Sequence, residues 1–224
     1  MTPGPPGTSG VSTTLCAQFV VSLFVDAASV SVFDFAGRQS TVCASSGLAA
    51  RVDSLQFELG EGPHWQALSS GQPVLCPDLR TMEHSSWPMF STTAQGLGAR
   101  AVFAFPMKLG AATVGVVDLL CTTPRRLDSH QVSLALSMAN RSAGAAVRLA
   151  TQLANESANT EHEMAPALRR EVHQATGMIQ VQLDTSATEA LARLRSHAFA
   201  VGTSISTIAE AVVHGHLDFS SLPE

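Results

Sequence analysis

Residues 169–213 read RREVHQATGMIQVQLDTSATEALARLRSHAFAVGTSISTIAEAVV and decide the fold of the last part of this chain. Apolar residues recur there at spacings of three and four, which is typical of amphipathic helices. Ser186, which forms a capping box with Glu189, and Ser204 each indicate a helix start. Gly202 and Gly215 indicate helix ends. The stretch therefore predicts a three-helix bundle over residues 167–216, too small to enclose a catalytic pocket.

The residues expected to face inward follow the apolar stripe of each helix in turn. They are Leu168, Val172, Ala175, Ile179 and Leu183, then Ala190, Leu191, Leu194, Ala198 and Phe199, and finally Ile205, Ile208, Ala209, Val212 and Val213.

Short motifs in these helices resemble the ANTAR domain, the RNA-binding output module of bacterial transcription antitermination regulators. They are AxGM at 175–178, EA with LRxxA within 189–198, and IAxxVV at 208–213. The resemblance implies binding to RNA stem-loops, in a tandem arrangement, that prevents a terminator from forming. The family commonly places a lysine where this chain has Thr176. Candidate RNA contacts are Arg170, Gln174, Thr176, Gly177, Arg193 and Arg195, although Arg195 could instead pair with an acid inside the bundle.

Charge limits how this bundle could bind RNA. Residues 159–224 hold four arginines against eight acidic residues, a net charge of −4, within a chain of net charge −5. Proteins that hold nucleic acid by charge alone present a basic face. We therefore expect recognition of shaped or looped RNA by a few arginines and polar groups.

Residues 28–121 predict an α+β domain, an antiparallel sheet flanked by helices, preceded by a short helix at 15–25. The expected strands are 30–35, 41–44, 74–76, 101–106 and 113–120, and the expected helices are 63–70 and 87–96. The segments LGEGPHWQAL (59–68), GQPV with PDL (71–79), WPMF (87–90) and AVFAFPM with VGVVDLL (101–120) resemble a GAF domain over about residues 12–147. That resemblance implies a possible small-molecule ligand in a sensor domain, but no ligand or cofactor can be assigned from the residues.

Several residues of this region have an ordinary structural interpretation. Trp65 and Trp87 are typical of core packing, and His64 of a surface or capping histidine rather than a haem ligand. The carboxylates of Asp53, Glu58 and Glu61 are expected on loops without an acid–base partner, and no hydrolase, zinc-protease or phosphate-loop motif occurs. His214 and His216 lack a third ligand nearby, so no metal site and no enzyme activity are expected.

The four cysteines argue against a disulfide framework and against structural zinc. Cys16, Cys43, Cys76 and Cys121 are widely spaced and form no CxxC pair. Cys43, Cys76 and Cys121 lie on predicted strands, where free cysteine behaves as a small buried hydrophobe. Together with the absence of an apolar run of about twenty residues, this favours a reduced, cytoplasmic protein with no membrane partner.

A heptad-like stripe connects the two predicted domains. Its members are Val132, Leu136, Ala139, Ala143, Ala146, Ala150 and Leu153. Its alanines favour close packing of two helices, which predicts a homodimer seam. The alternative is that the stripe packs on the sheet of its own domain, and both can hold because one helix has two faces.

The sequence thus predicts a tail at 1–11, a sensor domain with a dimerisation helix at 12–150, a connector at 151–166, the bundle at 167–216 and a tail at 217–224. We expect a signal-responsive, homodimeric RNA-binding regulator of transcription antitermination. The alternative is a dimeric signalling or interaction module that senses a small ligand and does not bind RNA.

Overall fold

The computed structural model describes residues 8–34, 38–81, 87–157 and 164–222, with backbone alone at 8–13, 155–157 and 164–170. The chain divides into two compact units. The first comprises residues 1–32 and 41–158, and the second comprises residues 33–40 and 159–224. Each is described by itself.

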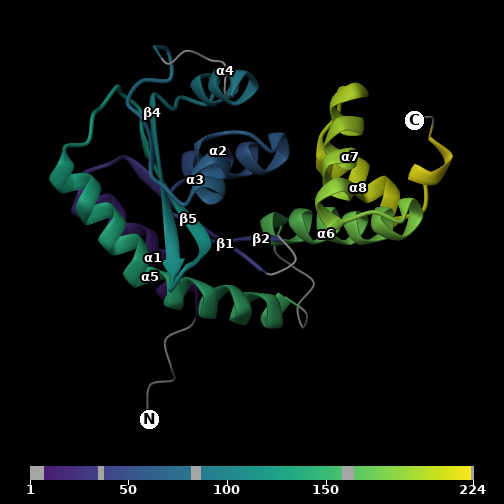
Figure 1. The fold of residues 1–224 in the computed structure, drawn as a ribbon, viewed down its shortest axis with the longest axis horizontal. Helices are drawn as coiled ribbons and strands as arrows, with labels where there is room; N and C mark the ends of the chain where they lie inside the picture. The colour runs from purple at the N-terminus through teal and green to yellow at the C-terminus, as the bar shows by residue number, and fades with distance from the viewer. Residues whose placement is uncertain (1–7, 35–37, 82–86, 158–163, 223–224) are drawn as a thin grey trace, which may run out of the picture. The chain divides into compact units, whose positions relative to one another are not determined.

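One mixed α and β framework contains the elements up to residue 157 (Figure 1). In chain order they are α1 (Thr8–Leu23), β1 (Ala27–Phe33), β2 (Gln39–Ala44), α2 (Gly47–Leu59), α3 (Pro63–Ser70), β3 (Val74–Cys76), α4 (Pro88–Gly96), β4 (Ala101–Leu109), β5 (Ala112–Cys121) and α5 (Ser129–Ser157). Within the described residues the strands form one five-stranded sheet in the order β2-β1-β5-β4-β3. The β1–β5, β4–β5 and β3–β4 pairs are antiparallel. The predicted antiparallel sheet flanked by helices is confirmed.

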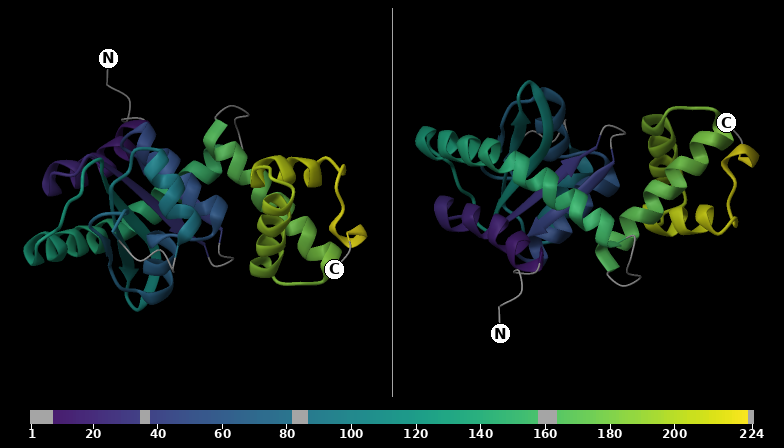
Figure 2. Two further views of the ribbon diagram at one scale, coloured as in Figure 1. Left: turned by 90° about the horizontal axis from the view of Figure 1, so that it is seen from above. Right: turned by 90° about the horizontal axis from the view of Figure 1, so that it is seen from below.

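The two faces of the sheet are covered by different helices. Helices α1 and α5 lie over one face, and α2, α3 and α4 lie over the other, as the two views of Figure 2 also show. The first core is built from alternating strand residues such as Val30, Phe103 and Val117. The second core contains their sequence neighbours, such as Val102 and Val116. This alternation follows from the two-residue period of a strand.

Helix α2 was not predicted, and its residues were expected on loops. Ser46 caps it, because its hydroxyl accepts the Ala49 amide hydrogen at 3.2 Å, and Gly60 ends it with a left-handed φ of 66°. Its inward face includes Asp53 and Gln56 as well as apolar residues. Two polar residues on the buried face disguised the helical period, although the Ser46 and Gly60 signals were present in the sequence.

The alanine stripe of α5 contacts its own sheet. Ala139, Ala143 and Ala146 are fully buried in the core that α5 shares with α1 and the sheet. Val132, Leu136, Ala150 and Leu153 are half-buried. The expectation that these alanines form a dimer seam is therefore corrected, and the intramolecular alternative describes them. The periodicity identified a buried face of the helix but not the surface that buries it.

The second unit contains the expected bundle of α6 (Met164–Leu183), α7 (Ala187–Ala200) and α8 (Ile205–Val213). The hydroxyls of Ser186 and Ser204 accept backbone amides at the starts of α7 and α8, as predicted. Phe199 was expected inside, but its side chain is 71% exposed. Leu191, Leu183 and Val213 are half-buried, and the side chain of Leu168 lies outside the described part.

Both predicted tails contain structure where they are described. Helix α1 begins at Thr8, inside the segment expected to be a tail. Residues 219–221 form a 3₁₀ helix whose Phe219 is buried and contacts the His197 ring, with centroids 5.4 Å apart. A single buried aromatic residue thus anchors the end of the chain to the bundle. Half of the predicted break at 155–166, residues 158–163, lies outside the described residues, and the other half is helical, because α5 continues to Ser157 and α6 begins at Met164.

Cysteine pairing was predicted wrongly. Cys16 on α1 and Cys43 on β2 form a disulfide, with their Cα atoms 6.0 Å apart. Cys76 and Cys121 are free and buried, as expected, and burial is the main cause that raises the pKa of the Cys76 thiol to about 11. Sequence spacing could not reveal the bridge, because it depends on which surface of the sheet α1 covers.

No helix in the described parts of the chain combines the length and the apolar character needed to cross a membrane.

The disulfide can be tested by counting thiols. Unfolded, unreduced protein should expose two reactive thiols, those of Cys76 and Cys121, and reduced protein should expose all four. Alkylation followed by peptide mass spectrometry assigns them. Reduction should also lower the free energy of unfolding by about 3 kcal/mol, because it frees a closed loop of the unfolded chain. Four reactive thiols before reduction would contradict the bridge.

The position of the alanine stripe can be tested with one substitution and a matched control. Ala143→Glu places a carboxylate in the core and should destabilise the first unit by more than about 3 kcal/mol. Ala154→Glu, at an exposed position of the same helix, should change stability by less than about 0.5 kcal/mol. Thermal unfolding and light scattering measure both. If the Ala143→Glu protein instead kept its stability and only dissociated from a dimer, the result would support the dimer-seam hypothesis.

Candidate functional site

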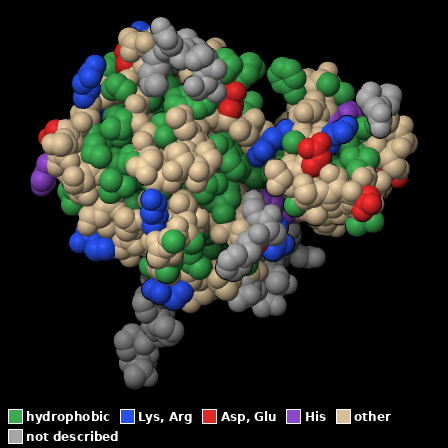
Figure 3. Space-filling model, viewed as in Figure 1, with side chains coloured by type: hydrophobic (Ala, Val, Ile, Leu, Met, Phe, Trp, Pro, Cys, Tyr) green, Lys and Arg blue, Asp and Glu red, His purple; other side chains and the backbone are tan. Residues whose placement is uncertain are grey.

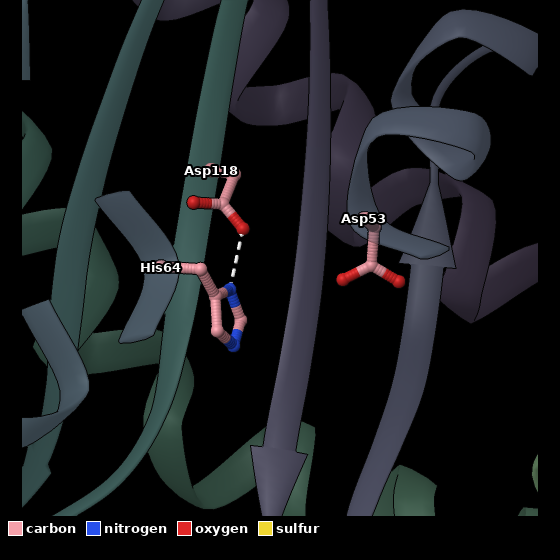
Figure 4. Close-up of side chains that lie close together, drawn as sticks. All are labelled: Asp53, His64 and Asp118. Carbon is pink, nitrogen blue, oxygen red and sulfur yellow. Dashed lines mark hydrogen bonds and ion pairs between the residues drawn. The ribbon is translucent and has the colours of Figure 1, made fainter. Parts of the chain in front are cut away.

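Three charged or titratable side chains meet inside the first unit. Asp53 comes from α2, His64 from α3 and Asp118 from β5, and each is at most 1% exposed. One ligand-type atom from each residue lies within 4.8 Å of the others. Figure 4 shows the His64 ring joined to Asp118, with the Asp53 carboxylate beside them. We call Asp53, His64 and Asp118 the buried triad.

The strongest contact of the buried triad joins His64 and Asp118. The imidazole Nδ1 lies 2.6 Å from Asp118 Oδ2, in a region from which water is excluded. Burial is the main cause that raises the pKa of the Asp118 carboxyl, and the charge of Asp53 adds to it. His64 and the Gln56 amide act in the opposite direction. Burial thus favours the neutral form of the Asp118 carboxyl, and His64 and Gln56 partly offset this effect.

Hydroxyl groups hold the Asp53 carboxylate. Ser31 on β1 donates to Asp53 Oδ1 at 2.8 Å, and Thr41 on β2 donates to Oδ2 at 2.6 Å. Because both oxygens accept a hydrogen bond, the orientation of this carboxylate is fixed. The expectation that Asp53 lies on a loop is therefore wrong, because this residue is part of the folded core.

A tight connection between α2 and α3 delivers His64 into the core. Gly62 has a φ of 127°, and a Cβ at this position would lie 2.6 Å from Gln56 Oε1. That same oxygen accepts the His64 backbone amide hydrogen at 2.9 Å. Only glycine permits this approach. The LGEGPHW segment therefore indicated a tight turn, but it did not show that the His64 side chain points into the core. The expectation of a surface histidine is wrong.

The other side chains of this region are structural. Trp65 donates its indole hydrogen to the Gln56 carbonyl at 2.6 Å, and Trp87 packs edge-on against Phe90. Glu61 accepts the Phe90 amide hydrogen at 2.6 Å, at the start of α4. The core-packing interpretation holds for Trp87, and Glu58 stays exposed on α2.

The candidate RNA contacts are distributed unevenly over the second unit. Gln174 and Gly177 of α6 are exposed, whereas Thr176 is buried and its hydroxyl donates to the Val172 carbonyl at 2.7 Å. Thr176 is therefore corrected from a surface contact to a buried residue that bonds to its own helix. Arg170 lies on α6, but its side chain is outside the described part.

Arg193 and Arg195 lie in different environments although only one residue separates them. Arg193 is exposed, and its Nε lies 3.1 Å from Glu189 Oε1. Arg195 is partly covered, and burial lowers the pKa of its guanidinium to about 10, which leaves it charged at neutral pH. This partial burial shows that the side chain packs against the bundle, and neither its pairing with an acid nor a contact with RNA is tested by it.

The described surface shows no broad basic area on the face drawn in Figure 3, where Lys and Arg side chains are scattered and interspersed with acidic ones in the second unit. A small groove on that unit is lined by Thr207, Glu210, Ala211, His214 and His216. The two imidazoles stack with centroids 6.1 Å apart. No third histidine, cysteine or carboxylate among the described residues joins them as a metal ligand.

Comparison with known proteins agrees with this architecture. A family model of the GAF domain matches residues 9–147, and one of the ANTAR domain matches residues 160–213. No curated protein matches the chain.

Two solved structures share the fold of the first unit. One is a domain assigned to a two-component sensor histidine kinase of Sinorhizobium meliloti 1021, with 20% identity, a TM-score of 0.50, and coverage of 68% of this chain and 99% of that one. The other is the GAF domain region of a protein assigned as a membrane protein of Geobacter sulfurreducens PCA, with 16% identity, a TM-score of 0.50, and coverage of 63% and 93%. At these identities the likeness concerns the fold alone. The chain therefore belongs to the GAF domain family and carries an ANTAR domain after it, the composition of a regulatory signalling protein.

Proposed function

We propose that this protein is an RNA-binding regulator of transcription antitermination, in which the GAF domain senses a signal and the ANTAR domain binds RNA stem-loops. The observation that supports it most is the match of the ANTAR family model to residues 160–213, together with the capped three-helix bundle found there. The partner on this proposal is a pair of stem-loops in nascent RNA.

The surface of the bundle favours stacking and polar contacts over simple charge attraction. Phe199 is 71% exposed and Val181 is 85% exposed, while Gln174 and Arg193 offer polar groups. Unpaired bases of RNA loops stack on aromatic side chains and present their edges to polar groups. Such a surface can bind looped RNA despite a net charge of −4 in residues 159–224.

Homodimer formation belongs to the proposal, but it needs a surface other than the alanine stripe. Val21 and Phe24, at the end of α1, are exposed apolar residues of the GAF domain and are available for such a contact. Two ANTAR domains on one dimer would bind tandem stem-loops more tightly than either domain alone, since the second contact becomes intramolecular.

RNA binding can be tested directly by a gel-shift titration. The full chain should bind an RNA with two stem-loops and should bind the matching RNA duplex and DNA duplex weakly. A plot of the logarithm of the binding constant against the logarithm of the salt concentration should have a slope no steeper than about −3 per chain. The four arginines of residues 159–224 can neutralise at most about four phosphates. No binding to looped RNA by the dimer would contradict the proposal and favour a signalling module without RNA.

Arg193 and Arg195 should respond differently to substitution. Arg193→Ala should weaken RNA binding while changing the free energy of unfolding by less than about 0.5 kcal/mol, since its pair with Glu189 is exposed. Arg195→Ala should destabilise the bundle by about 1–3 kcal/mol, since the stem of that side chain is packed. Denaturant unfolding followed by circular dichroism measures both. Equal stability losses would contradict the assignment.

A further inference from the structure

The face of the sheet beneath α2 and α3 has a polar centre, in contrast to the opposite face. Ser29, Ser31 and Asp118 lie on it, and all are about 1% exposed. On the other side the same strands contribute Ala28, Val30 and Val117. A charged residue in mid-sheet is costly unless something compensates it. The buried triad of Asp53, His64 and Asp118 lies at this polar centre.

The hydrogen-bond pattern around the triad is incomplete. In the described residues, Ser29 Oγ is buried without a hydrogen-bond partner, and Asp118 Oδ1 has only the nearby Gln56 amide, which lowers the pKa of its carboxyl. Ser29 is the direct register partner of Asp118 in the antiparallel β1–β5 pair, so the two side chains are neighbours on the same face. A buried polar atom without a partner costs about 1–3 kcal/mol. The unpartnered Ser29 hydroxyl beside the Asp118 carboxylate points to a further polar species at this place.

The net charge of the buried triad indicates that the further species is a cation. Two ionised carboxylates and a neutral imidazole would carry −2, and the raised pKa of the Asp118 carboxyl reflects the cost of such a charge in this core. A divalent cation makes the enclosed group neutral, which removes the cost of an uncompensated buried charge. The hydroxyls of Ser31 and Thr41 already orient the Asp53 carboxylate, and hydrogen-bond donors commonly orient the carboxylate ligands of metals in this way.

We propose that Asp53, His64 and Asp118 bind one divalent first-row transition-metal ion, of the Mn²⁺, Fe²⁺, Co²⁺ or Zn²⁺ class, inside the GAF domain. The mixed set of two carboxylates and an imidazole suits these ions, whereas Ca²⁺ requires six to eight oxygen ligands. Ser29 or water completes the coordination. The inference concerns the sensor domain and does not depend on RNA binding by the ANTAR domain.

The geometry requires the triad to contract. Ligand atoms at about 2.0–2.2 Å from one ion lie about 3.0–3.6 Å apart at octahedral or tetrahedral angles, so triad atoms that lie within 4.8 Å of one another move together by up to about 1–2 Å. His64 coordinates in its neutral form. The proton between its ring and Asp118 therefore leaves to solvent or moves to the other ring nitrogen when the ion binds.

Cobalt provides a direct test with the full chain. Protein unfolded with a chelator and refolded with Co²⁺ should retain one ion per chain after gel filtration, measured by elemental mass spectrometry. It should also show the visible absorption of protein-bound Co²⁺ and a raised melting temperature. Asp53→Asn and Asp118→Asn should each reduce Co²⁺ affinity at least tenfold.

Matched controls separate the buried triad from adventitious surface binding. Asp184→Asn makes the same chemical change at an exposed residue whose φ of 48° asparagine tolerates. Replacing His214 and His216 by Gln removes the exposed pair of imidazoles. Both control proteins should retain the ion and its spectrum, because none of the substituted residues belongs to the buried triad.

Two results overturn the proposal. One is wild-type protein that refolds, as circular dichroism reports, without retaining an ion. The other is retention that is lost in the His214 and His216 variant but kept in folded Asp118→Asn. If an asparagine variant fails to fold, the wild-type ion content and spectrum still decide. RNA binding is measured separately, so a metal-free protein that binds RNA refutes this inference and leaves the proposed function intact.

Discussion

The enclosure of two carboxylates and an imidazole between a sheet and two helices is the constraint on which the GAF domain depends. Asp118 projects from the middle of β5, and its contact with His64 holds α3 against the sheet at one register. Asp53 does the same for α2 through Ser31 and Thr41. Apolar packing alone tolerates small slips, but directional bonds in a dry core do not. The positions of both helices follow from these few polar contacts.

The sequence predicted the elements whose signals are local. Two apolar runs separated by a turn at 108–111 identified the β4–β5 hairpin, and Ser186 and Ser204 marked the helices of the ANTAR domain correctly. The sequence did not predict features that depend on which other segment of the chain a residue contacts. Asp53 and Gln56 concealed α2 because polar residues on a buried face resemble a loop. The Cys16–Cys43 bridge and the inward direction of His64 likewise depend on contacts between distant segments.

The ANTAR domain shows how one motif can contain residues of different roles. The Thr176 hydroxyl donates a hydrogen bond to the Val172 carbonyl inside the bundle, while Gln174 and Gly177 are exposed. Along α7, Arg195 is partly covered, and Arg193 and Phe199 face solvent. A motif preserves the spacing of residues along a helix, and the helical period then divides them between core and surface. Only the exposed members can contact a ligand without unfolding the bundle.

The alanine face of α5 gives the GAF domain a particular mechanical property. A helix of 29 residues is about 44 Å long and stiff along its axis. Ala139, Ala143 and Ala146 bring the helix axis close to the sheet, and the larger Met138 and Leu149 of the same helix are buried in the core beside them. Sliding of α5 along the sheet would break these contacts and the hydrogen bond from the Lys108 amide to the Asn140 side chain, so the helix is held in register with the sheet. A rearrangement of the sheet is therefore converted into displacement of a rigid rod.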